Sequence, residues 1–158
     1  MPDSLILLLR QPHFFSLAEV QQAGERGWSK RFDGTEDPMC FVTQNGGVTF
    51  IKAGALVINL LQSGTPYLED VEYVAKQLPR EEQKRAWLAH SAWAALDNLN
   101  RKIAKADSYA GLARFALNLS DLNCAGIYLP KEQVMMPNDG TAEEGLHLII
   151  RKELPFSS

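Results

Sequence analysis

The chain has 158 residues, of which 46% are apolar and 22% are charged, and its formal net charge is −3. These values fit one domain with a continuous core, so we expect a single α+β domain over residues 1–158. Acidic and basic residues are interspersed in small groups. This argues against nucleic acid as a partner, because a general nucleic-acid binder needs a dense basic face.

The chain also lacks the sequence features of a membrane or exported protein. The longest apolar stretch, residues 53–61, is about half the length that crosses a bilayer, and the N-terminus lacks the basic and long apolar regions of a signal peptide. Cys40 and Cys124 lie far apart in apolar sequence, which indicates free buried thiols. We therefore expect a cytoplasmic protein that does not contact a membrane.

The first third of the chain predicts a strand, a helix and a hairpin. Residues 4–9 form a short apolar run that is typical of a strand covered on both faces. Ser16 and Glu19 have the spacing of a capping box, and the helix that they begin is expected to end near Gly27. Two β-rich runs, residues 40–43 and 48–51, then flank Asn45-Gly46-Gly47, which predicts a tight hairpin.

The middle of the chain predicts another strand and two helices, followed by an ambiguous segment. A strand is expected over residues 55–61, and Thr65 and Pro66 have the residue types that begin a helix. Pro79 would end that helix and open a second one. Residues 86–103 fit either a helix or, in their central part, a strand, and helix propensity favours the helix.

A third helix is expected from Asp107 or Ser108 to Asn123, followed by a strand over residues 124–129 that Pro130 stops. Residues 146–150 predict a last strand. Strands interleaved with helices, plus one tight hairpin, indicate an α+β fold with a mixed β-sheet packed by helices.

Three segments resemble a group of uncharacterised bacterial α+β domains: His90-Ser91-Ala92-Trp93 through Asp97, the helix that contains Tyr109, and residues 124–130. In that group a His-x-Ala-Trp strand ending in Asp precedes a helix and a short strand closing in Pro. The likeness covers roughly residues 66–139 and carries no known reaction. It implies that residues 89–99 form a strand and that the fold is a ferredoxin-like sandwich with an added β-hairpin.

A search for chemistry finds no catalytic motif. Phosphate-binding glycine loops and the Gly-x-Ser-x-Gly serine elbow are absent from the sequence. Residues 137–144 fail as a calcium loop because Met135 and Leu146 occupy the first and last ligand positions. None of the three histidines has a partner at metal-ligand spacing. We therefore expect no catalytic residue, no metal and no cofactor.

The candidate ligand or partner surface comprises His90, Trp93, Asp97, Tyr128, Met135 and Met136. His90, Trp93 and Asp97 would share one face of a helix, whereas on a strand His90 would point away from the other two. The methionines are candidates because Met repacks easily against a partner.

The function that we expect from these features is a non-enzymatic interaction or accessory domain, which binds another protein or a second copy through an exposed sheet face or edge. Two alternatives stay open. One is a small-molecule-binding protein or enzyme with a pocket near His90, Trp93 and Asp97. The other is a toxin-neutralising protein whose acidic surface caps a basic toxin.

Overall fold

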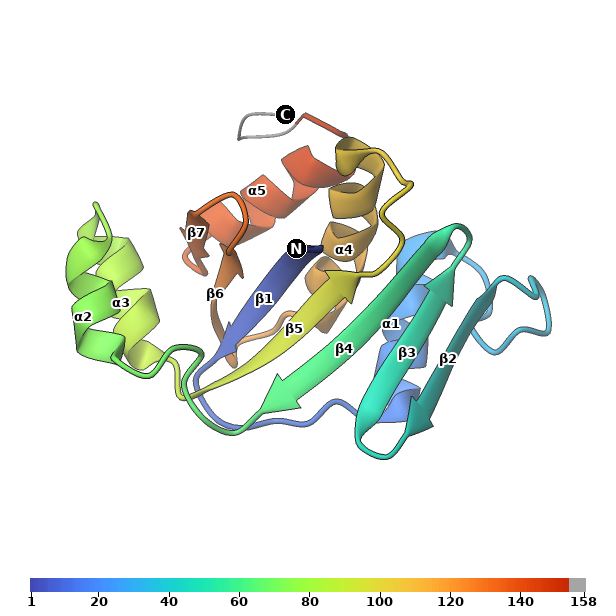
Figure 1. Cartoon of the computed structure of the whole chain (residues 1–158), viewed down its shortest axis with the longest axis horizontal. Helices are drawn as coiled ribbons and strands as arrows, with labels where there is room; N and C mark the ends of the chain where they lie inside the picture. Colours follow the sequence, from blue (N-terminus) through green and yellow to red (C-terminus); the bar gives the residue numbers. More distant parts are fainter. Residues whose placement is uncertain (154–158) are drawn as a thin grey trace.

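The computed structural model describes residues 1–153, which form helices and strands around one antiparallel sheet (Figure 1). In chain order the elements are β1 (Asp3–Leu9), α1 (Leu17–Trp28), β2 (Cys40–Asn45), β3 (Val48–Ala53), β4 (Leu56–Ser63), α2 (Val71–Gln77), α3 (Glu81–Ala89), β5 (Ala92–Asn98), α4 (Lys105–Leu119), β6 (Cys124–Leu129), β7 (Val134–Pro137) and α5 (Thr141–Ile150). The fold is therefore α+β, as the sequence predicts.

The sheet has seven strands in the order β2-β3-β4-β5-β1-β6-β7. Every pair of neighbouring strands is antiparallel, so the expected mixture of strand directions is wrong. The reason lies at the centre, where β1 pairs along its whole length with β5, a strand that follows it by more than 80 residues. Sequence patterns carry no information on that distant pairing.

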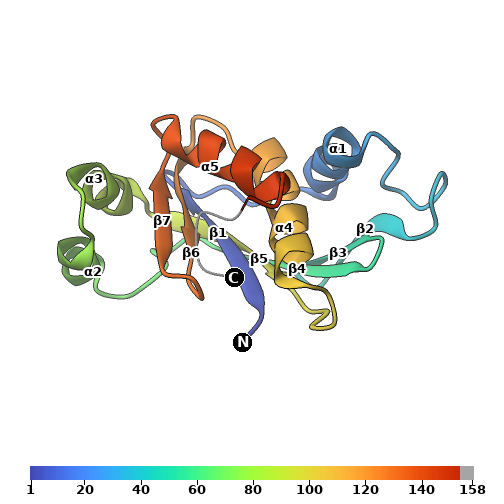
Figure 2. The same cartoon turned by 90° about the horizontal axis from the view of Figure 1, so that it is seen from above.

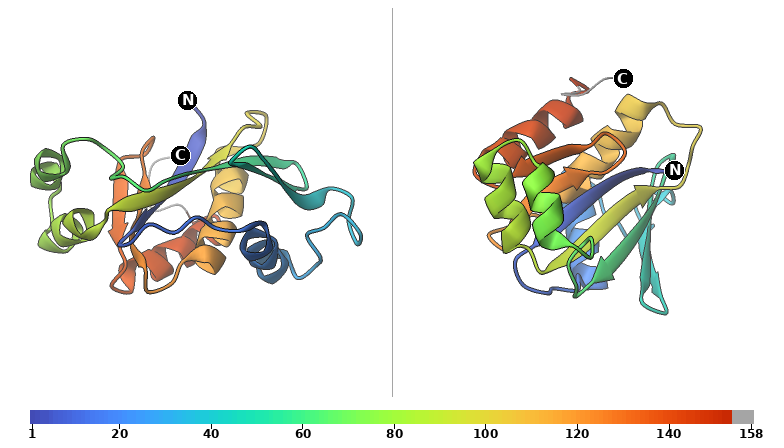
Figure 3. Two further views of the ribbon diagram at one scale, coloured as in Figure 1. Left: turned by 90° about the horizontal axis from the view of Figure 1, so that it is seen from below. Right: turned by 60° about the vertical axis from the view of Figure 1, so that its left-hand side comes forward.

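The helices divide the sheet surface unequally. One face is covered by α1, α4 and α5, and the large core lies between them and the strands (Figure 2). The other face is covered only at its β7 end, where α2 and α3 pack over a smaller cluster that includes Ile6, Leu8 and Trp87. Figure 3 shows no helix over the second face of β2, β3 and β4.

The first strand and the first helix form as predicted. Alternate residues of β1 enter the large and the small cluster, so this strand is covered on both faces. Helix α1 begins with the complete capping box, in which Ser16 accepts from the backbone of Glu19 and Glu19 accepts from the backbone of Ser16.

The predicted hairpin is confirmed as β2 and β3. Gly46 and Gly47 connect these strands with φ angles of 60° and 87°. Side chains rarely tolerate this left-handed region, which explains the two glycines at the turn.

The ambiguous segment divides between the two interpretations. Residues up to Ala89 are helical in α3, whereas Ala92–Asn98 form β5, so the helical interpretation is wrong for the second half. Ala92, Ala94 and Leu96 are buried under the helical layer, and β5 pairs with β4 on one side and β1 on the other. Hydrogen bonding on both sides outweighs the helix propensity of alanine.

Two further predictions are wrong. The helix expected at Thr65 and Pro66 begins only at Val71, because the Asp70 side chain caps it by accepting from the backbone of Tyr73 at 3.0 Å. Residues 146–150, expected as a strand, belong to α5. Its residues Ala142, Leu146 and Ile149 recur at helical spacing and enter the large core. Among residues 1–153, no helix has the length and apolar character needed to cross a membrane.

Candidate functional site

The uncovered half of the second sheet face is the main candidate site, and we call it the open face. Residues that alternate with the core positions of β2 to β5 point to it. Its members are Phe41, Thr43, Phe50, Lys52, Val57, Asn59, Leu61 and Asp97. Phe50 is 41% exposed and Leu61 is 37% exposed. Apolar side chains in neighbouring positions of an uncovered sheet are typical of a surface that another molecule covers.

A polar row crosses this apolar face. Strand register places Asp97 directly between Asn59 on β4 and Ser4 on β1. The Ser4 hydroxyl donates to Asp97 Oδ1 at 2.5 Å. The Oδ1 atom of Asn59 is buried and accepts no hydrogen bond from any residue of the described chain.

Aromatic rings pack together on the sheet face that carries Asp97, at the edge of the small cluster. Tyr67, in the loop between β4 and α2, packs edge to face on Trp93 and Tyr128, with centroid distances of 5.3 and 5.9 Å. Burial raises the pKa of Tyr67, and so do the charge that Tyr128 would carry if ionised and the carboxylate of Asp97. Burial also raises the pKa of Tyr128. Both phenols therefore stay protonated and neutral.

His90 lies beneath this aromatic group and is only 4% exposed. Its Nε2 atom accepts from the backbone of Tyr67 at 3.1 Å, and its Nδ1 atom donates to the carbonyl of Trp87. Burial lowers the pKa of His90, so the neutral ring that these two bonds require is favoured. Since both nitrogens are engaged, His90 acts as a positioning residue that holds the Tyr67 loop against the sheet.

Strand register places Trp93, Asp97 and Tyr128 on the same face of the sheet. Trp93 and Tyr128 both contact Tyr67, whereas Asp97 lies four residues beyond Trp93 along β5, and the buried His90 packs on Trp87. Met135 and Met136 are 4% and 6% exposed and enter the small and the large cluster, respectively. The contact surface expected at these methionines is therefore not exposed. Edge strand β7 is itself covered, because the Gln83 side chain on α3 donates to the Met135 carbonyl at 2.9 Å.

Sequence reasoning missed the remaining members of the open face. Phe50, Asn59 and Leu61 lie in predicted strands, and their alternation with buried positions was the available signal. Tyr67 falls within the helix expected at Thr65 and Pro66, whereas the structure places it in the loop before α2. Only the loop from residue 64 to 70 places its ring against Trp93.

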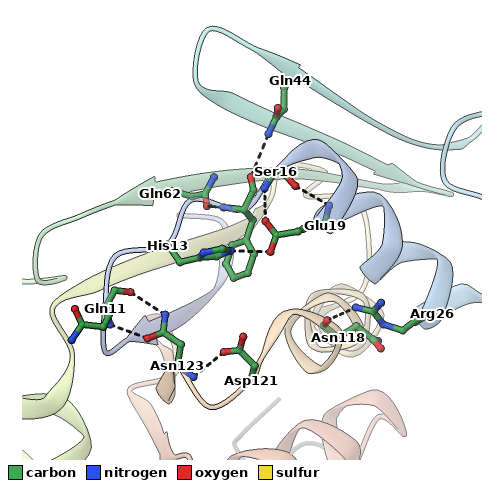
Figure 4. Close-up of polar contacts among 11 residues, drawn as sticks. Gln11, His13, Ser16, Glu19, Arg26, Gln44, Gln62, Asn118, Asp121 and Asn123 are labelled. Carbon is green, nitrogen blue, oxygen red and sulfur yellow. Dashed lines mark hydrogen bonds and ion pairs between the residues drawn. The ribbon is translucent and has the colours of Figure 1, made fainter.

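A second polar cluster holds the connection between β1 and α1 (Figure 4). The backbone of Phe15 donates to Gln62 on β4 at 2.6 Å, and Gln11 and Asn123 bond reciprocally at 2.9 Å. His13 lies 2.8 Å from Glu19. Burial tends to raise the pKa of Glu19, but its bonds to Ser16 and His13 lower it overall. Because these side chains form hydrogen bonds with one another and with the backbone of the loop, the cluster stabilises the conformation of the β1–α1 loop.

Other features give no stronger site. A cleft of about 290 Å³ lies beside this loop and is lined by Glu19, Arg26 and Asp121, among others. Another of about 350 Å³ combines Arg10 and Arg85 with Glu82 and Asp139, so its charges cancel. Cys40 and Cys124 are free and buried, and burial raises the pKa of both thiols. No group of three metal-ligating side chains occurs within residues 1–153.

The fold and the site together define an α+β domain with an antiparallel sheet that is covered by helices on one face and partly open on the other. Searches with protein-family models, curated proteins and solved structures find no match to this chain.

Proposed function

We propose that this chain is a non-enzymatic protein-binding domain that receives its partner on the open face. The observation that carries the proposal is the unequal cover of the second sheet face, on which α2 and α3 protect only the β7 end. The uncovered part presents Phe50 and Leu61 on adjacent strands. Covering such side chains removes apolar area from water, which favours association by about 25 cal/mol for each Å².

The test compares three forms of the full chain as immobilised baits in a lysate of the cells that natively produce it. The face variant carries Phe50→Thr and Leu61→Thr, which keep β propensity while they remove apolar area. The matched control is Leu122→Thr, because Leu122 is 94% exposed but lies in the turn between α4 and β6.

We expect wild type and the control to retain a common partner that the face variant loses. Circular dichroism of all three forms verifies that they are equally folded. Equal capture by the three baits, or no reproducible partner, would overturn the proposal.

A toxin-neutralising role is the second candidate, and it is a special case of protein binding. The net charge of −3 and the acidic Asp97 on the open face favour a basic partner. The genes beside the coding sequence test this candidate: an adjacent gene for a secreted basic toxin would support it, and a conserved different neighbour would count against it.

A pocket for a small molecule near His90, Trp93 and Asp97 has less support, because His90 is buried and both its nitrogens are engaged. Alanine at His90 and at Asp97 provides the test. If ligand-induced stabilisation or turnover survives both substitutions, this alternative fails.

We also infer that the fold is a ferredoxin-like sandwich with an added hairpin and that the chain is related to the bacterial α+β group named above. In support, the run β1-α1-β4-β5-α4-β6 is a β-α-β-β-α-β unit whose strands are adjacent in the order β4-β5-β1-β6. The β2–β3 hairpin extends the sheet beyond β4. Backbone NOEs between β1 and β5 test the central pairing, and their absence would refute the assignment.

A further inference from the structure

We propose that the partner inserts a basic side chain, arginine or lysine, at Asp97 when it covers the open face. This inference rests on the proposed function and specifies the chemistry of the partner at one position. It follows from the place of Asp97 in the sheet and from the groups that surround its carboxylate.

Asp97 is a lone anion among uncharged side chains, because its neighbours in the strand register, Ser4 and Asn59, are both neutral. Along β5 the preceding residue on this face is Ala95, and Leu61 of β4 lies opposite Ala95. None of the ion pairs within residues 1–153 includes Asp97. The Ser4 hydroxyl is its hydrogen-bond donor within this part of the chain. The carboxylate is partly exposed, so in the free protein its remaining acceptor positions are accessible to water.

A partner that covers Phe50 and Leu61 displaces that water. A carboxylate that loses its hydration without gaining a counter-charge or donors is strongly destabilised. One hydroxyl from Ser4 cannot replace the water, since an ionised carboxylate has about four acceptor positions. A partner with only apolar side chains here would therefore bind poorly. A partner with a guanidinium or ammonium group would replace the lost water by donating hydrogen bonds to the carboxylate and neutralising its charge.

The groups around Asp97 suit a cation. The adjacent Asn59 is a neutral amide, so it brings no positive charge that would compete with a cation at Asp97. Tyr67 lies close enough to Asp97 for the carboxylate to raise its pKa, and its ring provides aromatic surface for an alkyl stem or a planar guanidinium. The other charged member of the open face, Lys52, is bonded to the carbonyl of Gly54 in its own hairpin.

The experiment measures binding of two capped tripeptides to the full ¹⁵N-labelled chain by NMR titration. The first probe is acetyl-Leu-Arg-Leu-amide, and the second is acetyl-Leu-citrulline-Leu-amide, which has the same shape without the charge. We expect saturable shifts at the amides of Asn59 and Asp97, with an affinity about tenfold higher for the arginine probe, equivalent to about 1.4 kcal/mol. The isosteric Asp97→Asn substitution should remove this preference, whereas Glu144→Gln on α5 should not.

The outcomes separate the two proposals. Equal affinity of both probes for the open face would overturn the proposal of a basic side chain at Asp97. It would leave the proposed protein-binding function of this face standing. Failure of either probe to shift these amides, or a preference for arginine that survives Asp97→Asn, would also refute the assignment of a cation to Asp97. Sedimentation of wild type, Lys52→Gln and Asp97→Asn covers the remaining case. If the chain forms a dimer that requires both Lys52 and Asp97, the basic group at Asp97 is Lys52 of a second copy. That result would overturn the proposal that a different protein supplies it.

Discussion

Replacing Gly24 with alanine should destabilise the protein although it improves helix propensity. An added Cβ atom would lie 2.6 Å from Cγ and Cδ2 of Phe32 and 2.9 Å from Cδ1. The ring cannot simply move away, because Phe32 is fully buried between Trp28 and Phe115, with centroid distances of 5.5 and 5.8 Å. Overpacking of this kind costs about 1–3 kcal/mol, while exchanging glycine for alanine inside a helix returns about 1 kcal/mol. We therefore expect Gly24→Ala to lower the free energy of unfolding by about 1 kcal/mol.

Gly27, one turn further along α1, provides the matched control. A Cβ atom there would meet Asn118 Nδ2 at 3.5 Å and Arg114 Cβ at 3.6 Å, which are ordinary contacts. The same substitution should therefore raise the free energy of unfolding by about 0.5 kcal/mol, because alanine restricts the unfolded chain.

Urea unfolding followed by tryptophan fluorescence measures both variants, and an unchanged slope against urea verifies that stability alone has changed. The two substitutions should shift the midpoint in opposite directions. If Gly24→Ala is as stable as wild type or more so, the close contact between α1 and Phe32 is refuted.

Two further predictions concern buried polar groups. Burial lowers the pKa of His90 below its ordinary value of 6.5. As the pH falls, the unfolded chain therefore binds a proton at this histidine before the folded chain does. The free energy of unfolding should consequently decrease as the pH drops from 6.5 towards the lowered pKa. Urea titrations at several pH values should show a smaller decline in His90→Gln but not in His147→Gln, and an equal decline in all three forms would contradict this. The buried Asn98 side chain donates to the Ser108 hydroxyl at 2.8 Å. Replacing Asn98 with alanine should lower the free energy of unfolding by about 1–3 kcal/mol. In a double-mutant cycle, Asn98→Ala with Ser108→Ala should cost less than the sum of the single changes, and strict additivity would refute the coupling.

The parts of the fold that the sequence predicts correctly are those with local causes. Ser16 and Glu19 bond to each other's backbone across three residues, so the start of α1 is visible in the sequence. Gly46 and Gly47 adopt the backbone angles of a tight turn without help from distant residues. The continuous apolar run of β1 likewise indicates cover on both faces, which the structure provides.

The site was predictable in part. Trp93, Asp97 and Tyr128 were named by residue type, and strand alternation places all three on one face of the sheet. Their neighbour Tyr67 depends on a hydrogen bond to His90, which is 23 residues away in the chain. The position of Asn59 beside Asp97 depends on the register of β4 against β5.

The sequence by itself determined the class of the protein, the ends of α1 and the hairpin turn, because backbone hydrogen bonds between near neighbours and glycine sterics decide them. Tertiary structure decided that residues 146–150 are helical, since a short apolar run fits a helix or a strand equally well until α4 packs against it. It also decided that β5 is a strand and that all neighbours are antiparallel, through pairing with β1. The open face exists only as a result of that assembly, because α2 and α3 cover the β7 end of the sheet and leave the second face of β2, β3 and β4 without a helix.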